Sequence, residues 1–178
     1  MNFGNNANVR RQKKAITLNR KWEGDTNKMD FIFKDINVDE LDLIKPLWDK
    51  LNQLHLQDSK YFKEHYKTNT FEKRCKKFLQ MGKKDIRIEI VEDDNAVIIG
   101  YCISTVEKEK GEIESLFIEE ECRKNKLGNK LITNAIEWLK ERRCNKILVS
   151  VADGHEDVFN FYMKQGFYPR LTYLELKE

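Results

Sequence analysis

The spacing of hydrophobic residues along the chain predicts a domain that contains both strands and helices. Alternating apolar and polar residues, as in DIRIEIVE at 85–92, are typical of a half-buried strand. Apolar residues three or four positions apart, as between 131 and 139, indicate one face of a helix. The predicted strands are 30–36, 85–92, 96–106, 113–118, 147–151 and a last strand, YLEL, within 168–177. The predicted helices are 47–55, 71–79, 131–139 and 158–165.

Capping residues and helix breakers predict where these helices begin and end. A polar residue followed three positions later by glutamate is a capping-box pattern, and it occurs at 37–40, 69–72 and 153–156. Pro46 does not suit a helix interior, so we expect a kink or a restart of the helix there. Gly82 and Gly166 are expected to follow helix ends.

The order of the elements predicts a mixed α/β fold, with a central, mostly antiparallel sheet flanked by helices. Hairpins occupy the middle of the chain, and a β–α–β–α–β arrangement closes it. The helix at 131–139 connects the strands 113–118 and 147–151, which we expect to be parallel neighbours. A purely parallel, doubly wound sheet is not favoured.

Composition indicates one domain at 29–178, preceded by a basic arm at 1–28. The chain has 178 residues, of which 40% are hydrophobic, enough for a full core. Residues 1–28 hold seven Lys/Arg and two Asp/Glu, whereas the remainder holds 26 basic and 28 acidic residues. The basic charge therefore comes from the arm, and nucleic-acid binding by the whole protein is not favoured.

The arm has several open interpretations. It could be a flexible, solvated tail, or a tail that touches anionic partners in salt-sensitive contacts. It could also be non-native, with Met29 as the true start, because RKWEGD is a sequence that a purine-rich ribosome-binding site encodes.

The sequence predicts neither a membrane-spanning protein nor a small protein stabilised by disulfides. The longest apolar run, Ala96–Ile103, has eight residues, so we predict no membrane span, and the N-terminus lacks the apolar region of a secretory signal. The four cysteines are spread without close pairs, which is neither a disulfide framework nor a zinc signature. We expect a cytoplasmic protein without a metal site.

The stretch CRKNKLGNKL at 122–131 is the strongest local signal for a ligand. It places a glycine and several basic residues where an apolar strand turns into a helix, and backbone N–H groups at a helix start favour phosphate. The spacing fits neither a P-loop nor a dinucleotide fingerprint. By itself the stretch could equally be a basic surface turn.

Two segments together resemble the GNAT superfamily of acetyl-CoA-dependent N-acetyltransferases. IESLFIEEECRKNKLGNKLI at 113–132 is similar to the family's motif A, Arg/Gln-x-x-Gly-x-Gly/Ala, with Arg123 and Gly128 at its ends. Lys126 stands where the motif has its first glycine. HEDVFNFYMKQGF at 155–167 resembles the family's N-x-x-A-x-x-F-Y-x-x-x-G-F. The resemblance covers the chain apart from the arm and implies a GNAT-like acyl-CoA N-acyltransferase fold.

The resemblance implies a binding mode for acetyl-CoA. Amides of the motif-A turn would hold the pyrophosphate, and Lys126 would be strained by about 1 kcal/mol if its φ is positive. A bulge in 114–118 would splay that strand from 147–151, and pantetheine would pair with its backbone in the gap. An amide there would also polarise the acetyl carbonyl. His155 contacts the cofactor or caps a helix. The residues assigned to acetyl-CoA are Leu116, Phe117, Ile118, Arg123, Lys124, Asn125, Lys126, Leu127, Gly128, Asn129 and His155.

The implied reaction is direct acetyl transfer to a primary amine, with no metal. Tyr162, at the family's Tyr position, is the candidate general acid, although it could also be a packed helix residue. Glu114 could accept a proton through water, bind the ammonium, or be a solvent-facing strand residue. Aromatic residues expected near the acceptor are His55, Tyr61, Phe62, His65 and Tyr66.

The acceptor and the assembly stay open at the level of sequence. A small-molecule amine is favoured, and a homodimer is compatible with the resemblance. Ser115 replaces a second acid found in spermidine/spermine acetyltransferase-like members, which weakens a polyamine interpretation. The alternatives are a protein N-terminal or lysine acetyltransferase and a CoA-binding regulatory module with weak or lost catalysis.

Overall fold

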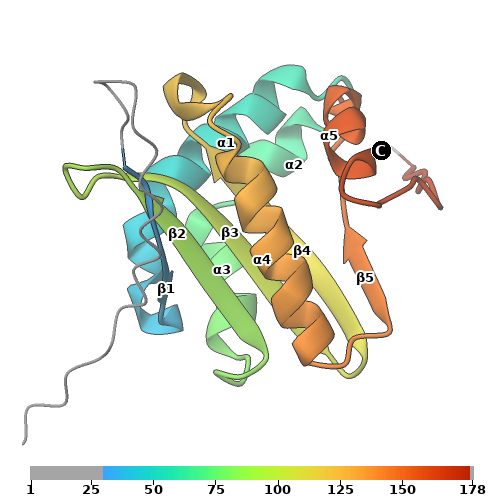
Figure 1. Cartoon of the computed structure of the whole chain (residues 1–178). Helices are drawn as coiled ribbons and strands as arrows, with labels where there is room; N and C mark the ends of the chain where they lie inside the picture. Colours follow the sequence, from blue (N-terminus) through green and yellow to red (C-terminus); the bar gives the residue numbers. More distant parts are fainter. Residues whose placement is uncertain (1–29, 177–178) are drawn as a thin grey trace, which may run out of the picture.

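The computed structural model describes residues 30–176, and its centre is a five-stranded sheet in the order β1-β2-β3-β4-β5 (Figure 1). The first four strands are antiparallel neighbours, and β5 runs parallel to β4. Their bounds are β1 Ile32–Ile36, β2 Ile86–Glu92, β3 Ile98–Glu107, β4 Lys110–Ile118 and β5 Lys146–Val149. The predicted mixed, mostly antiparallel sheet is confirmed. The interpretations of the arm at 1–28 lie outside the described residues.

Helices cover both faces of this sheet (Figure 1). On one face lie α1 Lys45–Asp58, α2 Lys63–Thr68 and α3 Phe71–Leu79, and on the other lies α4 Leu127–Glu141. A short helix, α5 Phe159–Met163, follows β5. Three 3₁₀ segments complete the order: η1 Val38–Ile44, η2 Glu120–Cys122 and η3 Glu156–Val158. None of the described helices is long and apolar enough to span a bilayer.

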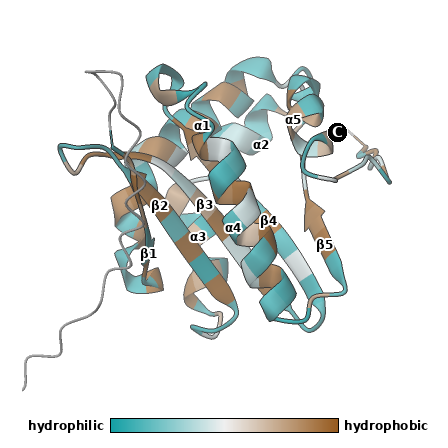
Figure 2. Cartoon of the chain, viewed as in Figure 1, coloured by the Kyte–Doolittle hydropathy of each residue, from teal (hydrophilic) through white to brown (hydrophobic). Residues whose placement is uncertain are grey.

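Two hydrophobic cores form because successive residues of a strand point to opposite faces. On β3, Tyr101 and Ile103 pack with α1 and α3, whereas Cys102 packs with α4. Leu131 and Leu139 of α4 are fully buried, as their helical spacing predicts. Burial of each such leucine contributes roughly 1.5–3 kcal/mol, so the apolar face of α4 stabilises its packing on the sheet. Figure 2 shows hydrophobic and hydrophilic residues alternating along β2.

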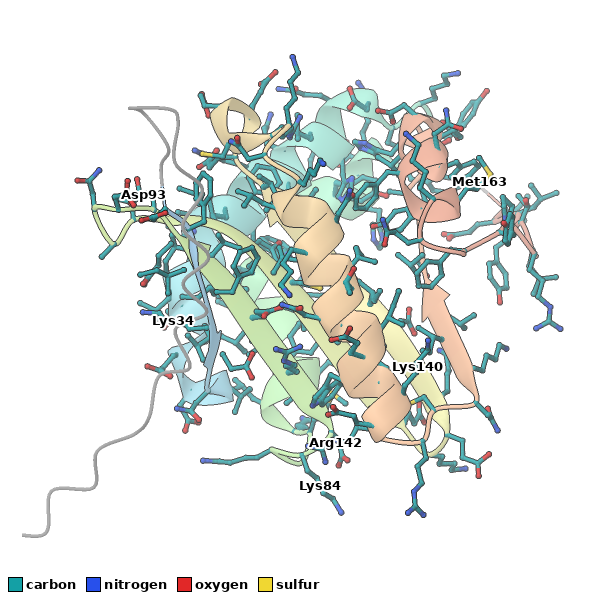
Figure 3. The ribbon with its side chains drawn as sticks, viewed as in Figure 1. Lys34, Lys84, Asp93, Lys140, Arg142 and Met163 are labelled. Carbon is teal, nitrogen blue, oxygen red and sulfur yellow. The ribbon has the colours of Figure 1, made fainter. Side chains whose placement is uncertain are left out.

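The ends of α4 follow ordinary helix chemistry. Lys140 and Arg142 lie at its C-terminal end (Figure 3), where positive charge interacts favourably with the helix dipole. The guanidinium of Arg142 also lies over the ring of Trp138, 5.3 Å from its centre. The N-terminal end is unusual, because its N-cap residue, Lys126, has a left-handed backbone.

The predicted helix starts are partly confirmed. The capping box of Asn37 and Glu40 forms, with the Asn37 amide donating to Glu40 Oε2 at 2.8 Å, and it begins η1. Pro46 lies in the first turn of α1, so the predicted restart is confirmed.

The other two capping-box predictions are wrong. Thr70, not Asn69, caps α3, because its hydroxyl accepts from the Lys73 amide at 3.3 Å. The carboxylate of Asp153 is instead engaged by the Ser59 hydroxyl and the Lys60 amide, so it does not cap η3.

A bulge in β4 separates it from β5, as predicted. Ile103 pairs with Ser115 and Ser104 pairs with Ile113, so Glu114 is an extra residue on β4. Pairing between β4 and β5 covers only Lys110–Ile113 with Lys146–Val149. Beyond Ile113 the two strands diverge, which leaves part of the β4 edge without a strand partner (Figure 1).

The last predicted strand, YLEL within 168–177, is wrong over the described residues. Residues 167–176 form no strand, and the side chains of Tyr173 and Leu174 are 90% and 94% exposed. An alternating pattern makes a strand only where a neighbouring strand pairs with its backbone. The C-terminal segment, residues 168–176, has no such partner here, and β5 stays an edge of the sheet.

Candidate active site

A cavity of about 380 Å³ opens where β4 and β5 diverge. Its walls are β4 at 113–116, the segment 149–152 at the end of β5, the helices α1, α2 and α3, and the segment 155–162. The bulge at Glu114 creates this space, because it turns the end of β4 away from β5. The cavity therefore lies at the position that the sequence assigns to transfer chemistry.

Tyr162 of α5 lines the cavity, as its predicted role requires. Its ring is held edge-on between those of Phe161 and Phe167, at 5.1 and 6.0 Å between ring centres. Burial raises the pKa of Tyr162 to about 12. Because of this raised pKa, the phenol is protonated at neutral pH. In the described part of the chain no residue forms a hydrogen bond with the Tyr162 hydroxyl, so it is free to donate to a ligand.

Glu114 is not a free carboxylate. Its side chain is only 3% exposed and accepts hydrogen bonds from Arg74 Nη2 at 2.7 Å, Thr105 Oγ1 at 2.7 Å and Lys77 Nζ. Burial alone raises the pKa of Glu114, but the hydrogen bonds from Lys77 and Thr105 and the charge of Arg74 outweigh it, so the pKa is lowered. The predicted solvent-facing alternative is therefore wrong, and both carboxylate oxygens are occupied.

Arg74 is a cavity residue that the sequence did not reveal. Its Nη2 donates to both the backbone carbonyl and the carboxylate of Glu114, at 3.1 and 2.7 Å. Sequence analysis predicted a helix at 71–79 and assigned Arg74 no role in a site. The contact between Arg74 and Glu114 could not be predicted from local sequence, because the two residues are 40 positions apart in the chain.

The motif-A turn offers amides for an anion. No residue from 124 to 129 donates a backbone hydrogen bond within the described part of the chain. These are the free N–H groups expected at a helix start. Arg123 differs, because its amide donates to the carbonyls of Glu119 and Glu120. Its side chain donates to the Ile118 carbonyl at 3.2 Å, so the free amides begin at Lys124.

The turn has left-handed backbone at two lysines. Lys124 has φ 77° and Lys126 has φ 60°, conformations that glycine adopts without strain. The position where motif A has its first glycine therefore does require positive φ, at a cost of about 1 kcal/mol for lysine. Asn125 supports the turn, because its side-chain amide donates to the Cys122 carbonyl at 3.1 Å.

Gly128 lies in the first turn of α4, facing α5. A Cβ placed on it would lie 3.4 Å from the ring of Phe161, an ordinary contact. Its φ is not in the left-handed region. The protein alone thus tolerates a side chain here, and any need for glycine would come from a ligand.

Two histidines meet in the cavity wall. The rings of His55 on α1 and His155 are perpendicular, 4.6 Å between centres. His155 Nε2 lies 3.7 Å from Asp58 Oδ2, too far for a hydrogen bond. Burial, and then the neighbouring His155, lower the pKa of His55 to about 4. His155 also stands at the N-cap of η3 but caps it with no side-chain hydrogen bond.

The predicted acceptor aromatics divide into two groups. His55, His65 and Tyr66 line the cavity. Tyr61 and Phe62 do not, and Tyr61 is 61% exposed. Trp48 and Asn52 on α1 line the cavity as well, and the sequence analysis did not assign either of them to a site.

Comparison with known proteins agrees with this geometry. The model of the Acetyltransferase (GNAT) family matches residues 48–167. No curated protein sequence matches the chain.

Several solved structures share the fold at low identity. The PaiA N-acetyltransferase from Thermoplasma acidophilum, in complex with coenzyme A, is 17% identical with a TM-score of 0.66, covering 81% of this chain and 93% of that one. A putative acetyl transferase from Pyrococcus furiosus is 18% identical with a TM-score of 0.61, covering 83% and 99%. Glucosamine-6-phosphate N-acetyltransferase from Arabidopsis thaliana is 16% identical with a TM-score of 0.58, covering 83% and 97%.

Proposed function

The chain belongs to the GNAT acetyltransferase family, and we propose that it transfers the acetyl group of acetyl-CoA directly to the primary amine of a small molecule. Enzymes of this family use acetyl-CoA as cosubstrate. The observation that carries the acceptor proposal is the cavity of about 380 Å³ with Tyr162 in its wall. A space of this size takes a small ligand.

For acetyl-CoA we propose the binding mode that the motif implies. The free amides of 124–129 support a pyrophosphate site at the start of α4. The edge of β4 at 116–118 has no strand partner on its β5 side, which supports pantetheine pairing there, because extended ligands add to sheet edges. The Ile118 carbonyl already accepts from Arg123 Nε. Arg123 would contribute its side-chain charge rather than its amide. His155 would contact the cofactor from the opposite wall.

Two proton transfers accompany the reaction. The acceptor ammonium, with a pKa of about 10, must lose a proton, and the departing thiolate must gain one. Tyr162 is our proposed acid, and its place in the cavity wall supports this role. The buried surroundings that raise the pKa of the phenol also raise the pKa of the thiol formed beside it, so burial by itself does not make the proton transfer more uphill than in water.

We do not retain Glu114 as the base. Three donors occupy its carboxylate, and its lowered pKa makes it a weak proton acceptor. We propose instead that Glu114 positions Arg74 and that water in the cavity takes the ammonium proton.

A catalytically weak CoA-binding module is the second candidate, and the strained Lys126 favours it. Turnover separates the two. CoA release is measured with acetyl-CoA and a panel of small amines, N-terminal peptides and lysine peptides. We expect turnover on small amines. Tight CoA binding without turnover on any acceptor would contradict the enzyme proposal, and turnover on peptides alone would point to a protein acetyltransferase.

We also propose a homodimer. The C-terminal segment carries five large apolar side chains that are at least 70% exposed: Tyr168, Leu171, Tyr173, Leu174 and Leu176. β5 is an edge strand with unpaired backbone on its outer side. A second copy that supplies a strand partner would cover both features.

A further inference from the structure

Arg74 lines the cavity, and two of its three guanidinium nitrogens have no hydrogen-bond acceptor among the described residues. Its Nη2 is engaged by Glu114, but no described residue accepts a hydrogen bond from Nε or Nη1. The side chain lines the cavity and is 30% exposed. Guanidinium N–H groups in a partly closed site are a strong ligand for a carboxylate or a phosphate.

The orientation of Arg74 is fixed before any ligand binds. Glu114 receives two hydrogen bonds from the same nitrogen, and the guanidinium lies over the ring of Phe78, 5.1 Å from its centre. Lys77 and Thr105 in turn hold the Glu114 carboxylate. A side chain held in this way loses little conformational freedom when it binds an anion.

The charge balance of the cavity favours an anion rather than a second cation. Among the described lining residues, Glu114 is the one carboxylate, and its charge is already shared between Arg74 and Lys77. Lys77 lies outside the lining but neutralises the Glu114 charge together with Arg74, so the described lining has no carboxylate left for a cation. A diamine or polyamine would bring a second ammonium to a wall that has no free carboxylate for it.

We propose that the acceptor carries an anionic group, a carboxylate or a phosphate, a few bonds from its primary amine, and that Arg74 binds this group. Arg74 and Tyr162 line the same cavity, so an anion bound by Arg74 would share this space with the reacting amine. This inference rests on the proposed acetyl transfer and narrows its acceptor class.

The test compares amines that differ only in the anion. kcat/KM is measured for β-alanine against its amide, for phosphoethanolamine against ethanolamine, and for several amino acids against their amides. A charge-assisted hydrogen bond predicts a preference of roughly 10–100-fold for the anionic member. The carboxylate and phosphate pairs show which anion is preferred. Turnover that is equal or better with the neutral members overturns the inference and leaves acetyl transfer standing, whereas no turnover on any amine contradicts acetyl transfer itself.

Two variants assign the preference to Arg74. Arg74→Gln should bring the ratio of anionic to neutral kcat/KM close to one, mainly through KM. Lys76→Gln is the matched control, because Lys76 is an exposed lysine of the same helix that neither pairs with Glu114 nor lines the cavity, and it should keep the ratio. Arg74→Lys keeps the positive charge but lacks the planar N–H donors of the guanidinium, so it should keep part of the preference for the anionic amine. Thermal denaturation identifies any variant that fails to fold, and an unchanged ratio in folded Arg74→Gln refutes the assignment.

Discussion

At the scale of single residues, the proposed mechanism is tested most directly at Tyr162. Tyr162→Phe keeps the ring contacts with Phe161 and Phe167 and removes the hydroxyl group that would donate the proton. General acid catalysis contributes about 10²–10⁴-fold, so we expect kcat to fall by at least about 100-fold with little change in stability. If kcat stays within about twofold, the acid role is wrong.

The pH profile gives a second view of the same residue. Since the pKa of Tyr162 is raised to about 12, its proton is retained across the usual assay range. Activity should therefore rise with pH as the acceptor ammonium deprotonates, with no decline from Tyr162 below about pH 10.

His55 predicts a pH dependence of stability that is separate from catalysis. Its pKa falls from about 6.5 in the unfolded chain to about 4 in the fold, so below pH 6.5 the unfolded state binds the extra proton. Stability from this group is complete above the unfolded pKa and is lost as pH falls. Between pH 7 and pH 5 the free energy of unfolding should decrease by about 2 kcal/mol.

Urea denaturation at the two pH values measures this loss. His55→Phe keeps a ring against His155 and should remove most of the decrease, whereas the exposed His65 has no comparable burial and His65→Phe should leave it in place. An equal pH dependence in the wild type and His55→Phe would assign the loss to other groups.

At the scale of elements, a substitution at the start of α4 should affect CoA binding without affecting the stability of the fold. Gly128→Ala adds a Cβ that only touches Phe161, in a backbone conformation that alanine accepts. Alanine favours a helix by about 1 kcal/mol over glycine, so we expect unchanged or higher stability. If the backbone approaches the pyrophosphate here, CoA affinity should fall by at least about tenfold.

Calorimetric titration with CoA measures this affinity. Glu137→Ala, on an exposed position of the same helix, is the control and should bind CoA as the wild type does. Undiminished CoA binding by Gly128→Ala would mean that the cofactor does not approach this turn closely.

Elements also show what the sequence could and could not predict. The motif-A turn was predictable, because a strand, a glycine and a helix start lie within about 20 consecutive residues. The bulge at Glu114 followed from the family resemblance rather than from residue pattern. The Arg74–Glu114 pair was not predictable, because it joins α3 to β4 across 40 positions and neither residue stands out locally. The predicted cap at Asp153 failed for a similar reason, since its carboxylate accepts hydrogen bonds from Ser59 and Lys60 at the end of α1.

At the scale of the whole molecule, the C-terminal segment is the part that the described chain leaves incomplete. YLEL has the alternation of a strand, yet Tyr173 and Leu174 are at least 90% exposed and pair with nothing. Exposed apolar residues in such a number are uncommon on a protein that functions as a monomer. The physical requirement is a backbone partner, and the outer edge of β5 in a second copy can supply one.

The oligomeric state tests this requirement. Light scattering after size exclusion should give the mass of a dimer for the wild type, and Tyr173→Lys combined with Leu174→Glu should give a monomer, because charges at these positions make burial costly. Leu43→Lys is the matched control: Leu43 is 49% exposed but lies in η1, far along the chain from this segment, and its variant should remain dimeric. A monomeric wild type at micromolar concentration would show that the segment is not covered by a second copy. If the dimer forms and the double variant still turns over acetyl-CoA, the cavity is complete within one chain, as its lining residues imply.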